Sequence, residues 1–479
     1  MNAATAAREA RASALPSARL ELAALSLAML LSSLGTSIAN VALPTLAEAF
    51  GASFGAVQWV VLAYLLASTA LIVGVGRLGD MVGRRRLLVG GIALFTAAST
   101  LCGTASTLWM LIAARGAQGL GAAVMMALAM AIVGAAVPRA RTGIAMGLLG
   151  TMSAIGTALG PSLGGVLIAG LGWRAVFLVS LPVGLLTLVL ARRHLPADPA
   201  VGSRPRGRFD TLGTLVLAAT LSAYALAVTL GGGGFGPVNL ALLLAAAAGA
   251  GLFLLRQSRA ASPLIQLATL RDPALAARLA AALLVATVMM ATLVVGPFYL
   301  SGALGLGAAA VGLVMSLGPV VAAFAGVPAG RLVDRWGPDH VTALGLGGMV
   351  LGLALLALLP SSFGIAGYAA PVSVVTAAYA LFQAANNTAV MAQADPARRG
   401  LVAALLNLSR NLGLITGASA MGAVFAAAAG ASSMATAAPE AIAGGMRMTF
   451  ALAAMLVACA LPLPVLVRFV VRRTPAPRP

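Results

Sequence analysis

Charge is what this chain has least of. Asp, Glu, Lys and Arg make up 9% of its 479 residues, whereas hydrophobic residues make up 61%. A soluble globular domain carries roughly 25% charged residues. The composition therefore excludes a soluble domain, and the mean hydropathy of +1.03 indicates a membrane protein that crosses the bilayer many times.

Residues that build reactive sites are equally scarce. The two cysteines, Cys102 and Cys459, lie in separate apolar segments, and the two histidines, His194 and His340, lie in polar gaps. These positions exclude a disulfide framework and an intramembrane metal site. The apolar segments carry no Ser/His/Asp cluster, and the chain has no phosphate-binding loop. We therefore expect no enzymatic activity and no cofactor.

The basic residues are all arginine, and they follow a pattern. They gather in every second polar gap, for example at 84–86, 192–208 and 472–478, while the alternate gaps are nearly uncharged. This is the positive-inside pattern of a protein in the cytoplasmic (inner) membrane, with both termini in the cytoplasm and an even number of crossings. The net charge of +19 thus reflects topology, and a nucleic-acid partner is not expected.

Apolar runs of about 20 residues predict an all-α protein with fourteen membrane helices. The predicted helices are 20–46, 57–78, 86–105, 107–136, 143–168, 174–193, 211–230, 237–255, 275–299, 308–330, 339–359, 366–391, 400–428 and 447–470. They divide into groups of six, two and six helices.

This division predicts two six-helix bundles with two additional central helices between them. The expected boundaries are a cytoplasmic N-terminal tail (1–19), the first bundle (20–193), a cytoplasmic linker (194–210), the two additional helices (211–257), a cytoplasmic loop (258–274), the second bundle (275–471) and a C-terminal tail (472–479).

An internal repeat supports the two bundles. The frame Gly-x-Leu-x-Asp-x-x-Gly follows the second helix and recurs after the second helix of the other bundle. Repeated halves are typical of carriers that work by rocking around a central site. We expect a cytoplasmic gate in which Asp80 pairs with Arg84 and Asp334 with Arg335; the alternative is a solvated turn. The gating candidates are Gly76, Asp80, Gly83, Arg84, Gly330, Asp334 and Arg335.

A glycine stripe marks the fifth helix. Gly156, Gly160 and Gly164 are four residues apart, so they share one helical face and allow close approach of a neighbour. Pro161 deletes a helical hydrogen bond, so we expect a bend there. We place the stripe at an interface that slides or seals, with pure helix packing as the alternative. Gly165 adjoins the stripe, and Gly147 lies on another face.

Polar groups inside the apolar segments are few. Arg115 and Arg410 are the charges expected at depth, and Gln118 lies one turn from Arg115. Buried charges usually face a cavity or a partner, although Arg410 could extend to the cytoplasmic surface. The predicted substrate cavity is lined by Thr36, Ser37, Asn40, Gln383, Asn386 and Asn387, with ordinary interhelical hydrogen bonding as the alternative for each.

Several motifs together resemble the major facilitator superfamily, and specifically its fourteen-helix drug:proton antiporter branch of multidrug efflux type. They are Asn40-Val-Ala-Leu-Pro44, the repeated loop after the second helix, Leu111-Ile-Ala-Ala-Arg115-Gly-Ala-Gln118-Gly119, and the 147–165 stretch, which is similar to the branch's antiporter motif. The resemblance implies alternating access around a cavity between helices 1, 4, 9 and 12. It also implies that Arg115 and Gln118 belong to a coupling region, to which we add Arg410.

One position departs from the branch. Many of its antiporters carry an acidic residue five positions before the Asn of the first-helix motif, and here that position is Gly35. All eleven acidic residues lie in gaps or near helix ends. Intramembrane proton relays generally use Asp, Glu or His, so the departure bears directly on proton coupling.

The expected function is export of small, largely apolar, neutral or anionic compounds, as in drug or toxic-metabolite efflux and antibiotic resistance, by a monomer driven by the proton gradient. The partners are a small-molecule substrate and the lipid bilayer. Arginine without carboxylate at depth favours neutral or anionic cargo over cations. The alternative is a specific metabolite or vitamin carrier, an importer or uniporter, in which Gly35 marks the loss of proton antiport.

Overall fold

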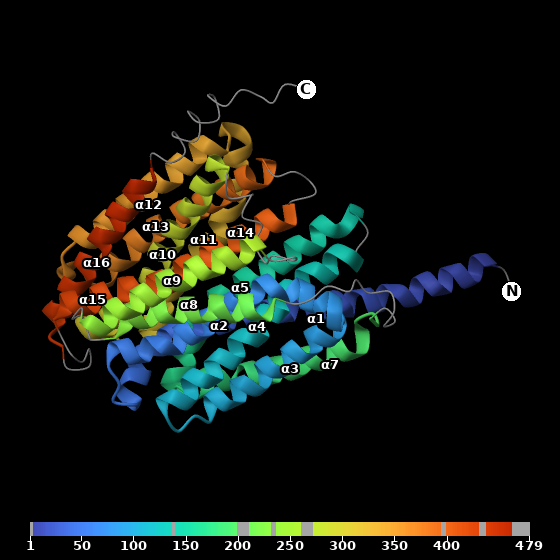
Figure 1. Cartoon of the computed structure of the whole chain (residues 1–479), viewed down its shortest axis with the longest axis horizontal. Coiled ribbons are helices and arrows are strands. Elements are labelled where there is room, and N and C mark those ends of the chain that lie inside the picture. Colours follow the sequence, from blue (N-terminus) through green and yellow to red (C-terminus); the bar gives the residue numbers. More distant parts are fainter. Residues whose placement is uncertain are drawn as a thin grey trace.

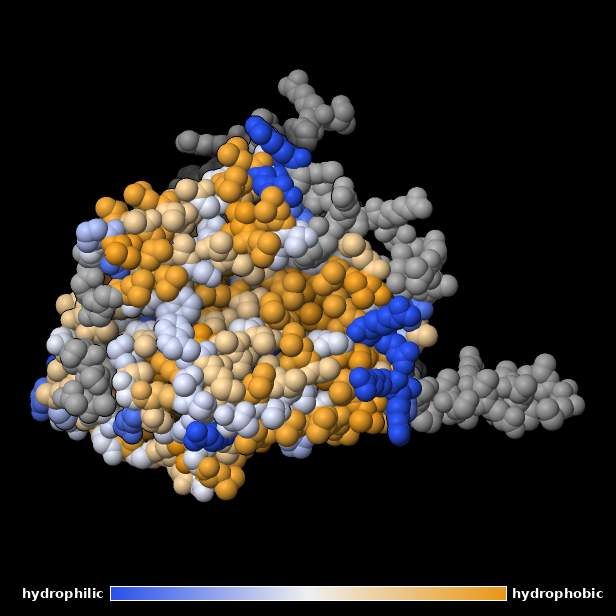
Figure 2. Space-filling model, turned by 60° about the horizontal axis from the view of Figure 1, so that its bottom comes forward, coloured by the Kyte–Doolittle hydropathy of each residue, from blue (hydrophilic) through white to orange (hydrophobic). Residues whose placement is uncertain are grey.

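The computed structural model describes residues 3–136, 139–198, 210–230, 236–259, 272–393, 399–430 and 437–461. Within these ranges fourteen helical spans are long and apolar enough to cross a membrane, which confirms the predicted number. The hydrophobic residues on the visible face form a broad belt, and the most hydrophilic side chains gather mainly at its margins (Figure 2).

The first bundle is built from seven helical segments. They are α1 (Ala3–Ala49), α2 (Phe54–Val82), α3 (Arg84–Gly103), α4 (Leu108–Ala136), α5 (Arg139–Leu171), α6 (Ala175–Leu178) and α7 (Ser180–His194). The short α6 and α7 together form the sixth span.

The additional helices are α8 (Thr211–Thr229) and α9 (Pro237–Arg259). The second bundle contains α10 (Pro273–Phe298), η2 (Tyr299–Ala303), α11 (Ala308–Trp336), α12 (Pro338–Leu358), η3 (Ser361–Phe363), α13 (Gly364–Gln393), α14 (Arg399–Thr416), η4 (Gly417–Met421), α15 (Gly422–Ala429) and α16 (Pro439–Ala460). In Figure 1, α8 and α9 run between the two bundles.

The last span differs most from its prediction. It was expected at 447–470, but α16 begins at Pro439, where the fixed backbone of proline suits the first helical turn. Arg447, expected as the first residue of this helix, therefore lies about two turns inside it and is exposed. Residues beyond Leu461 lie outside the described part of the chain.

The glycine stripe of α5 packs against α1 of the same bundle. A Cβ atom added at Gly160 would lie 2.7 Å from the Cβ of Ser37, and one added at Gly164 would lie 2.6 Å from a methyl carbon of Val41. Only glycine permits this approach of two helices. The stripe itself is thus an internal packing surface, and α5 continues through Pro161 as one helix.

The neighbouring face of α5 meets the other bundle. A Cβ atom at Gly165 would lie 2.6 Å from the carbonyl oxygen of Ala308 and 2.8 Å from the Cα of Gly312, both on α11. The interface predicted for the 147–165 stretch is therefore made by Gly165, one residue beyond the stripe.

Further contacts between the bundles lie at the same end of the molecule. Gln58 of α2 donates a hydrogen bond of 2.8 Å to the carbonyl oxygen of Ala418 in η4. The ring of Phe54 packs edge-on against Phe298 and Phe425, with centroid distances of 4.8 and 5.3 Å. These contacts join the bundles at the end where the gaps between helices carry few arginines.

The additional helices bridge both bundles. On one side α8 contacts α2, where Trp59 donates a hydrogen bond of 3.1 Å to Thr229. On the other side α8 contacts η4 and α15. The pair therefore spans the seam between the bundles.

Replacing Gly312 with valine should prevent closure at the arginine-poor end, because its side chain would strike the α5 backbone at Gly165. We expect labelling of a cysteine introduced at Phe54 to rise several-fold. Gly326→Val is the matched control, since no atom lies within 4 Å of a Cβ atom at Gly326 on the same helix. Equal labelling in the two variants would contradict this account of the closed end.

Candidate functional site

The first part of the candidate site surrounds Arg115 of α4, whose side chain is fully buried. Its Nε donates a hydrogen bond of 2.8 Å to the carbonyl oxygen of Val60, and its Nη1 donates to the side-chain oxygen of Gln118. Gln118 in turn donates a hydrogen bond of 2.7 Å to the hydroxyl of Ser99. The guanidinium is thus held by neutral acceptors from α2 and α4, while α3 orients Gln118.

An aromatic ring completes this cage. The guanidinium carbon of Arg115 lies 4.3 Å from the ring centre of Tyr64, and the hydroxyl of Tyr64 donates a hydrogen bond of 2.7 Å to the carbonyl oxygen of Ser32. A desolvated cation–π contact contributes about 2 kcal/mol. Neither Tyr64 nor Ser99 is among the cavity or coupling residues predicted from the sequence.

The charge of Arg115 has no carboxylate partner in the described part of the chain, where the ion pairs are Arg256–Asp210 and Arg278–Asp339. Its Nη2 is buried without a hydrogen-bond acceptor. No carboxylate among the described residues therefore neutralises this positive charge.

The ring of Phe95 packs against Gly35. A Cβ atom at Gly35 would lie 3.0 and 3.2 Å from two carbons of the Phe95 ring and 3.4 Å from the Tyr64 hydroxyl. The ring occupies the space into which a side chain at this position would extend. An acidic residue here would have to displace Phe95.

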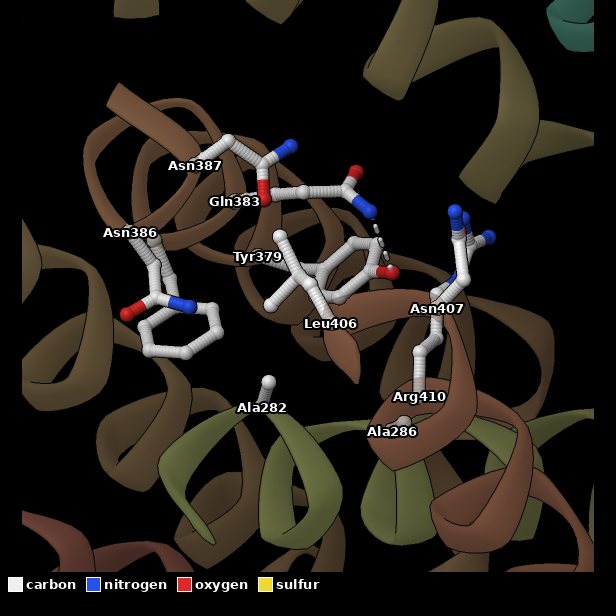
Figure 3. Close-up of a pocket in the computed structure, with 10 residues that line it drawn as sticks. Ala282, Ala286, Tyr379, Gln383, Asn386, Asn387, Leu406, Asn407 and Arg410 are labelled. Atoms are coloured by element: carbon white, nitrogen blue, oxygen red, sulfur yellow. Dashed lines mark hydrogen bonds between the residues drawn. The ribbon is translucent and has the colours of Figure 1, made fainter. Parts of the chain in front are cut away.

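The second part of the candidate site is a cavity of about 70 Å³ between α10, α13 and α14 of the second bundle. Figure 3 shows Ala282 and Ala286 of α10 on one side, with polar side chains from α13 and α14 around the rest. Its lining residues are Ala282, Ala286, Tyr379, Phe382, Gln383, Asn386, Asn387, Leu406, Asn407 and Arg410. Four carboxamides and one guanidinium thus share a small space with two aromatic rings.

The structure therefore brings Arg410, predicted for the coupling region, together with three residues predicted to line the substrate cavity. Gln383, Asn386 and Asn387 come from α13, and Arg410 comes from α14. Tyr379 and Asn407 extend the set; Gln383 donates a hydrogen bond of 3.1 Å to the hydroxyl of Tyr379.

Polar side chains that line this cavity are accessible to water, and we call it the wet cavity. Asn387, Asn407 and Arg410 are exposed although each lies on a membrane-spanning helix. Arg410 is five residues into the span Leu405–Ala429, about 8 Å along the helix. Exposed amides and charges at such depth are stable only in contact with water or a polar ligand.

The polar residues predicted on the first helix serve packing in this state. Ser37 donates a hydrogen bond of 3.3 Å to the carbonyl oxygen of Gly156 on α5, and Thr36 donates to the carbonyl oxygen of Ser32 within α1. Asn40 donates to carbonyl oxygens one turn back, which leaves its buried side-chain oxygen without a donor.

The two copies of the repeated loop lie at the arginine-rich end. Gly83 has a φ of +112°, which glycine adopts easily, whereas Gly76 and Gly330 have open space around them. In the second copy Asp334 and Arg335 are exposed, and no ion pair joins them among those of the described residues. Arg84 is half-buried and has a partner. The surroundings of Asp80 and Gly147 lie outside what the structure describes.

Asp198, which was not among the predicted site residues, holds the first copy of the repeated loop. The carboxylate of Asp198, at the start of the linker, accepts hydrogen bonds of 3.0 Å from the backbone N–H of Arg85 and 3.1 Å from that of Arg86. It therefore caps the N-terminus of α3, where negative charge is stabilising. A Cβ atom at Gly83 would collide with this carboxylate, and the positive φ of Gly83 also favours glycine at this turn.

A third arginine within a span was also missed. Arg278 of α10 is buried and forms an ion pair of 2.8 Å with Asp339 at the start of α12. Asn386 of the cavity donates a hydrogen bond of 3.5 Å to the carbonyl oxygen of Arg278. This pair fastens the arginine-rich ends of α10 and α12 beside the cavity.

Comparison with known families gives one decisive match. The family model of the Major Facilitator Superfamily matches residues 25–418. The chain belongs to this superfamily. It is therefore a membrane transporter and not an enzyme.

Among the curated members, the Multidrug resistance protein Stp of Mycobacterium tuberculosis is 32% identical over 419 residues, covering 85% of this chain and 76% of Stp. The Drug efflux pump JefA of the same organism is 33% identical over 438 residues, covering 87% and 82%. The Riboflavin transporter RibZ of Clostridioides difficile is 30% identical over 403 residues, covering 83% and 86%.

Solved structures share the superfamily fold. A bacterial homologue of the human lysosomal transporter Spinster, in an inward-facing and unoccupied conformation, matches with a TM-score of 0.71 at 17% identity over 97% of this chain and 99% of the other. The nucleoside transporter NupG matches with a TM-score of 0.66 at 12% identity, covering 94% and 99%.

Replacing Asp198 with asparagine should weaken the cap on α3, because the asparagine amide is uncharged and has only one acceptor oxygen. We expect hydrogen exchange at the amides of Arg85 and Arg86 to accelerate about fivefold, equivalent to ~1 kcal/mol. The control is Glu48→Gln, which changes an exposed carboxylate elsewhere. Unchanged exchange at both amides would show that Asp198 is not a cap.

Proposed function

We propose that this transporter exports small, largely apolar compounds that are neutral or anionic, as drugs or toxic metabolites are exported by efflux pumps. The observation that carries the proposal is the uncompensated guanidinium of Arg115, supported by Arg410 in the wet cavity of the second bundle. A positive charge in a low-dielectric site attracts anions, tolerates neutral molecules and repels cations.

Carboxylates do not offset these charges. In the described spans the acidic residues are Glu21, Glu48, Asp334, Asp339 and Glu440, and each lies within a few residues of the end of its span. A lipophilic cation would therefore find no anionic group at the depth of Arg115. This supports the preference for neutral and anionic cargo.

The arrangement of the bundles suits a loading state for export. They are in contact at the arginine-poor end, and positive-inside topology puts the arginine-rich end and both termini in the cytoplasm. Substrate would enter from the cytoplasm beside Arg410, and rocking would open the opposite end. We place the protein in the cytoplasmic membrane as a monomer, with the gate loops at Gly76–Arg84 and Gly330–Gly337 closing behind the substrate.

The direction and energy source rest on relatives and on the sequence. Stp is named a multidrug resistance protein and JefA a drug efflux pump, each at about one-third identity, and the 147–165 stretch resembles the antiporter motif. The chain has no nucleotide-binding motif, so the proton gradient is the proposed energy source, with Arg115, Gln118 and Arg410 in the coupling region.

A second candidate is a carrier for a specific metabolite or vitamin, without proton antiport. Gly35 favours it, because the acidic residue of the antiporters is absent and Phe95 fills the space. The riboflavin transporter RibZ shows that a relative of comparable similarity is named for a vitamin. Such a carrier would work as an importer or a uniporter.

Proteoliposomes separate the two candidates. For the exporter, an imposed pH gradient should drive flux of an aromatic carboxylate several-fold above the rate without a gradient, and substrate addition should move protons. Flux that is insensitive to a protonophore, with no proton movement, would instead support the carrier without antiport. Transport confined to quaternary ammonium dyes would contradict both the charge argument and the export of anions.

Replacing Gln118 with glutamate should switch the charge preference, since the new carboxylate would neutralise Arg115 at hydrogen-bond distance. We expect flux of an anionic substrate to fall at least tenfold while flux of a neutral one falls less than threefold. Gln118→Met removes the hydrogen bonds without adding charge and is the matched control. If both variants lowered both fluxes equally, Gln118 would have only a structural role.

A further inference from the structure

A second hollow lies far from the wet cavity, at the arginine-rich ends of α8 and α9. Its volume is about 360 Å³, and it is lined by Leu212, Val216, Leu252, Leu255, Arg256 and Arg259. Four aliphatic side chains and two guanidiniums thus form one groove between the two additional helices.

The order of these residues along α9 matches the depth profile of a lipid leaflet. Leu255 and Arg256 lie three and four residues after Leu252, and Arg259 lies three residues after Arg256, so the four share one helical face. From Leu252 to Arg259 the helix rises about 10 Å. The leucines therefore lie at the level of acyl chains when the arginines lie at the level of head groups.

The width of the groove is fixed by Asp210, which caps α8 and ties it to the end of α9. Its Oδ1 accepts a hydrogen bond of 2.9 Å from the Gly213 amide and forms an ion pair of 2.8 Å with Arg256, while its Oδ2 accepts from Gln257. Burial alone would raise the pKa of Asp210, but these partners outweigh it and hold the pKa below its ordinary value. The tie is thus present at neutral pH and is lost only as the pH falls through that lowered pKa.

Charge remains after this tie is made. Asp210 neutralises Arg256, whereas Arg259 has no hydrogen-bond or ion-pair partner among the described residues. The groove therefore keeps about one net positive charge above an apolar floor.

No described part of the chain covers the floor of this groove. Leu212, Leu252 and Leu255 are 53%, 55% and 58% exposed, and the principal contacts of α9 are with α8 alone. In a bilayer this surface meets lipid, so the occupant must carry both an apolar chain and a group that binds arginine.

We propose that this groove binds an anionic phospholipid of the cytoplasmic leaflet. The phosphodiester contacts Arg259 and the outer edge of Arg256, and an acyl chain lies against Leu212, Val216, Leu252 and Leu255. Basic sites between helix ends on the cytoplasmic side are suited to such head groups. The bound lipid would anchor the hairpin that spans the seam between the bundles.

Native mass spectrometry of the full chain, with phosphatidylglycerol or phosphatidylcholine of the same acyl chains, tests the proposal. The wild type should retain phosphatidylglycerol more tightly than phosphatidylcholine, and Arg259→Gln should weaken phosphatidylglycerol binding about fivefold, equivalent to ~1 kcal/mol. The control is Arg193→Gln, which removes an exposed arginine at the same end of the molecule, on α7, and should bind as the wild type does.

Three results would overturn the proposal. One is equal loss in the two variants, which would indicate only general surface charge; another is equal retention of the two lipids by the wild type. Displacement of the lipid by inorganic phosphate would indicate a site for a free anion. A photoactivatable phosphatidylglycerol should in addition label the segment Leu252–Arg259, and labelling confined to other segments would place the lipid elsewhere.

Discussion

A guanidinium that is withdrawn into a membrane must find acceptors, an aromatic face or water, because its burial in hydrocarbon costs roughly 3 kcal/mol or more. Arg115 meets this requirement with a carbonyl of α2, a carboxamide of α4 and the ring of Tyr64. The side chain of Arg115 thus ties α2 to α4 and contacts the ring of Tyr64. All its hydrogen-bond acceptors are neutral, so no carboxylate among the described residues cancels its charge.

The second constraint is the close approach between helices that glycine permits. The stripe of α5 brings α1 into backbone contact within the first bundle, and Gly165 gives the neighbouring face the same closeness to Gly312 of the second bundle. The same glycine geometry thus joins α5 to a helix of its own bundle and to a helix of the other bundle. Small residues at both faces allow the backbones of these helices to approach closely.

Much of the architecture follows from local pattern. Apolar length gave fourteen spans, and the repeated loop gave the two bundles, because each depends on composition within a short window. The prediction failed at the last span, which was expected to begin at 447 although the helix begins at Pro439. It also missed the pairing of Arg278 with Asp339 and the cap that Asp198 places on α3, since both join residues far apart in the chain.

The sequence by itself determined that the protein is an all-helical membrane carrier and that its deep charges are arginines, since hydropathy and residue identity settle both. Only the tertiary structure decided which polar residues act together. Gln383, Asn386, Asn387 and Arg410 share a cavity, while Ser37 turns to the backbone of α5. The reason is that the rotation of each helix and its neighbours are set by packing between distant segments, and a single helix's pattern cannot specify them.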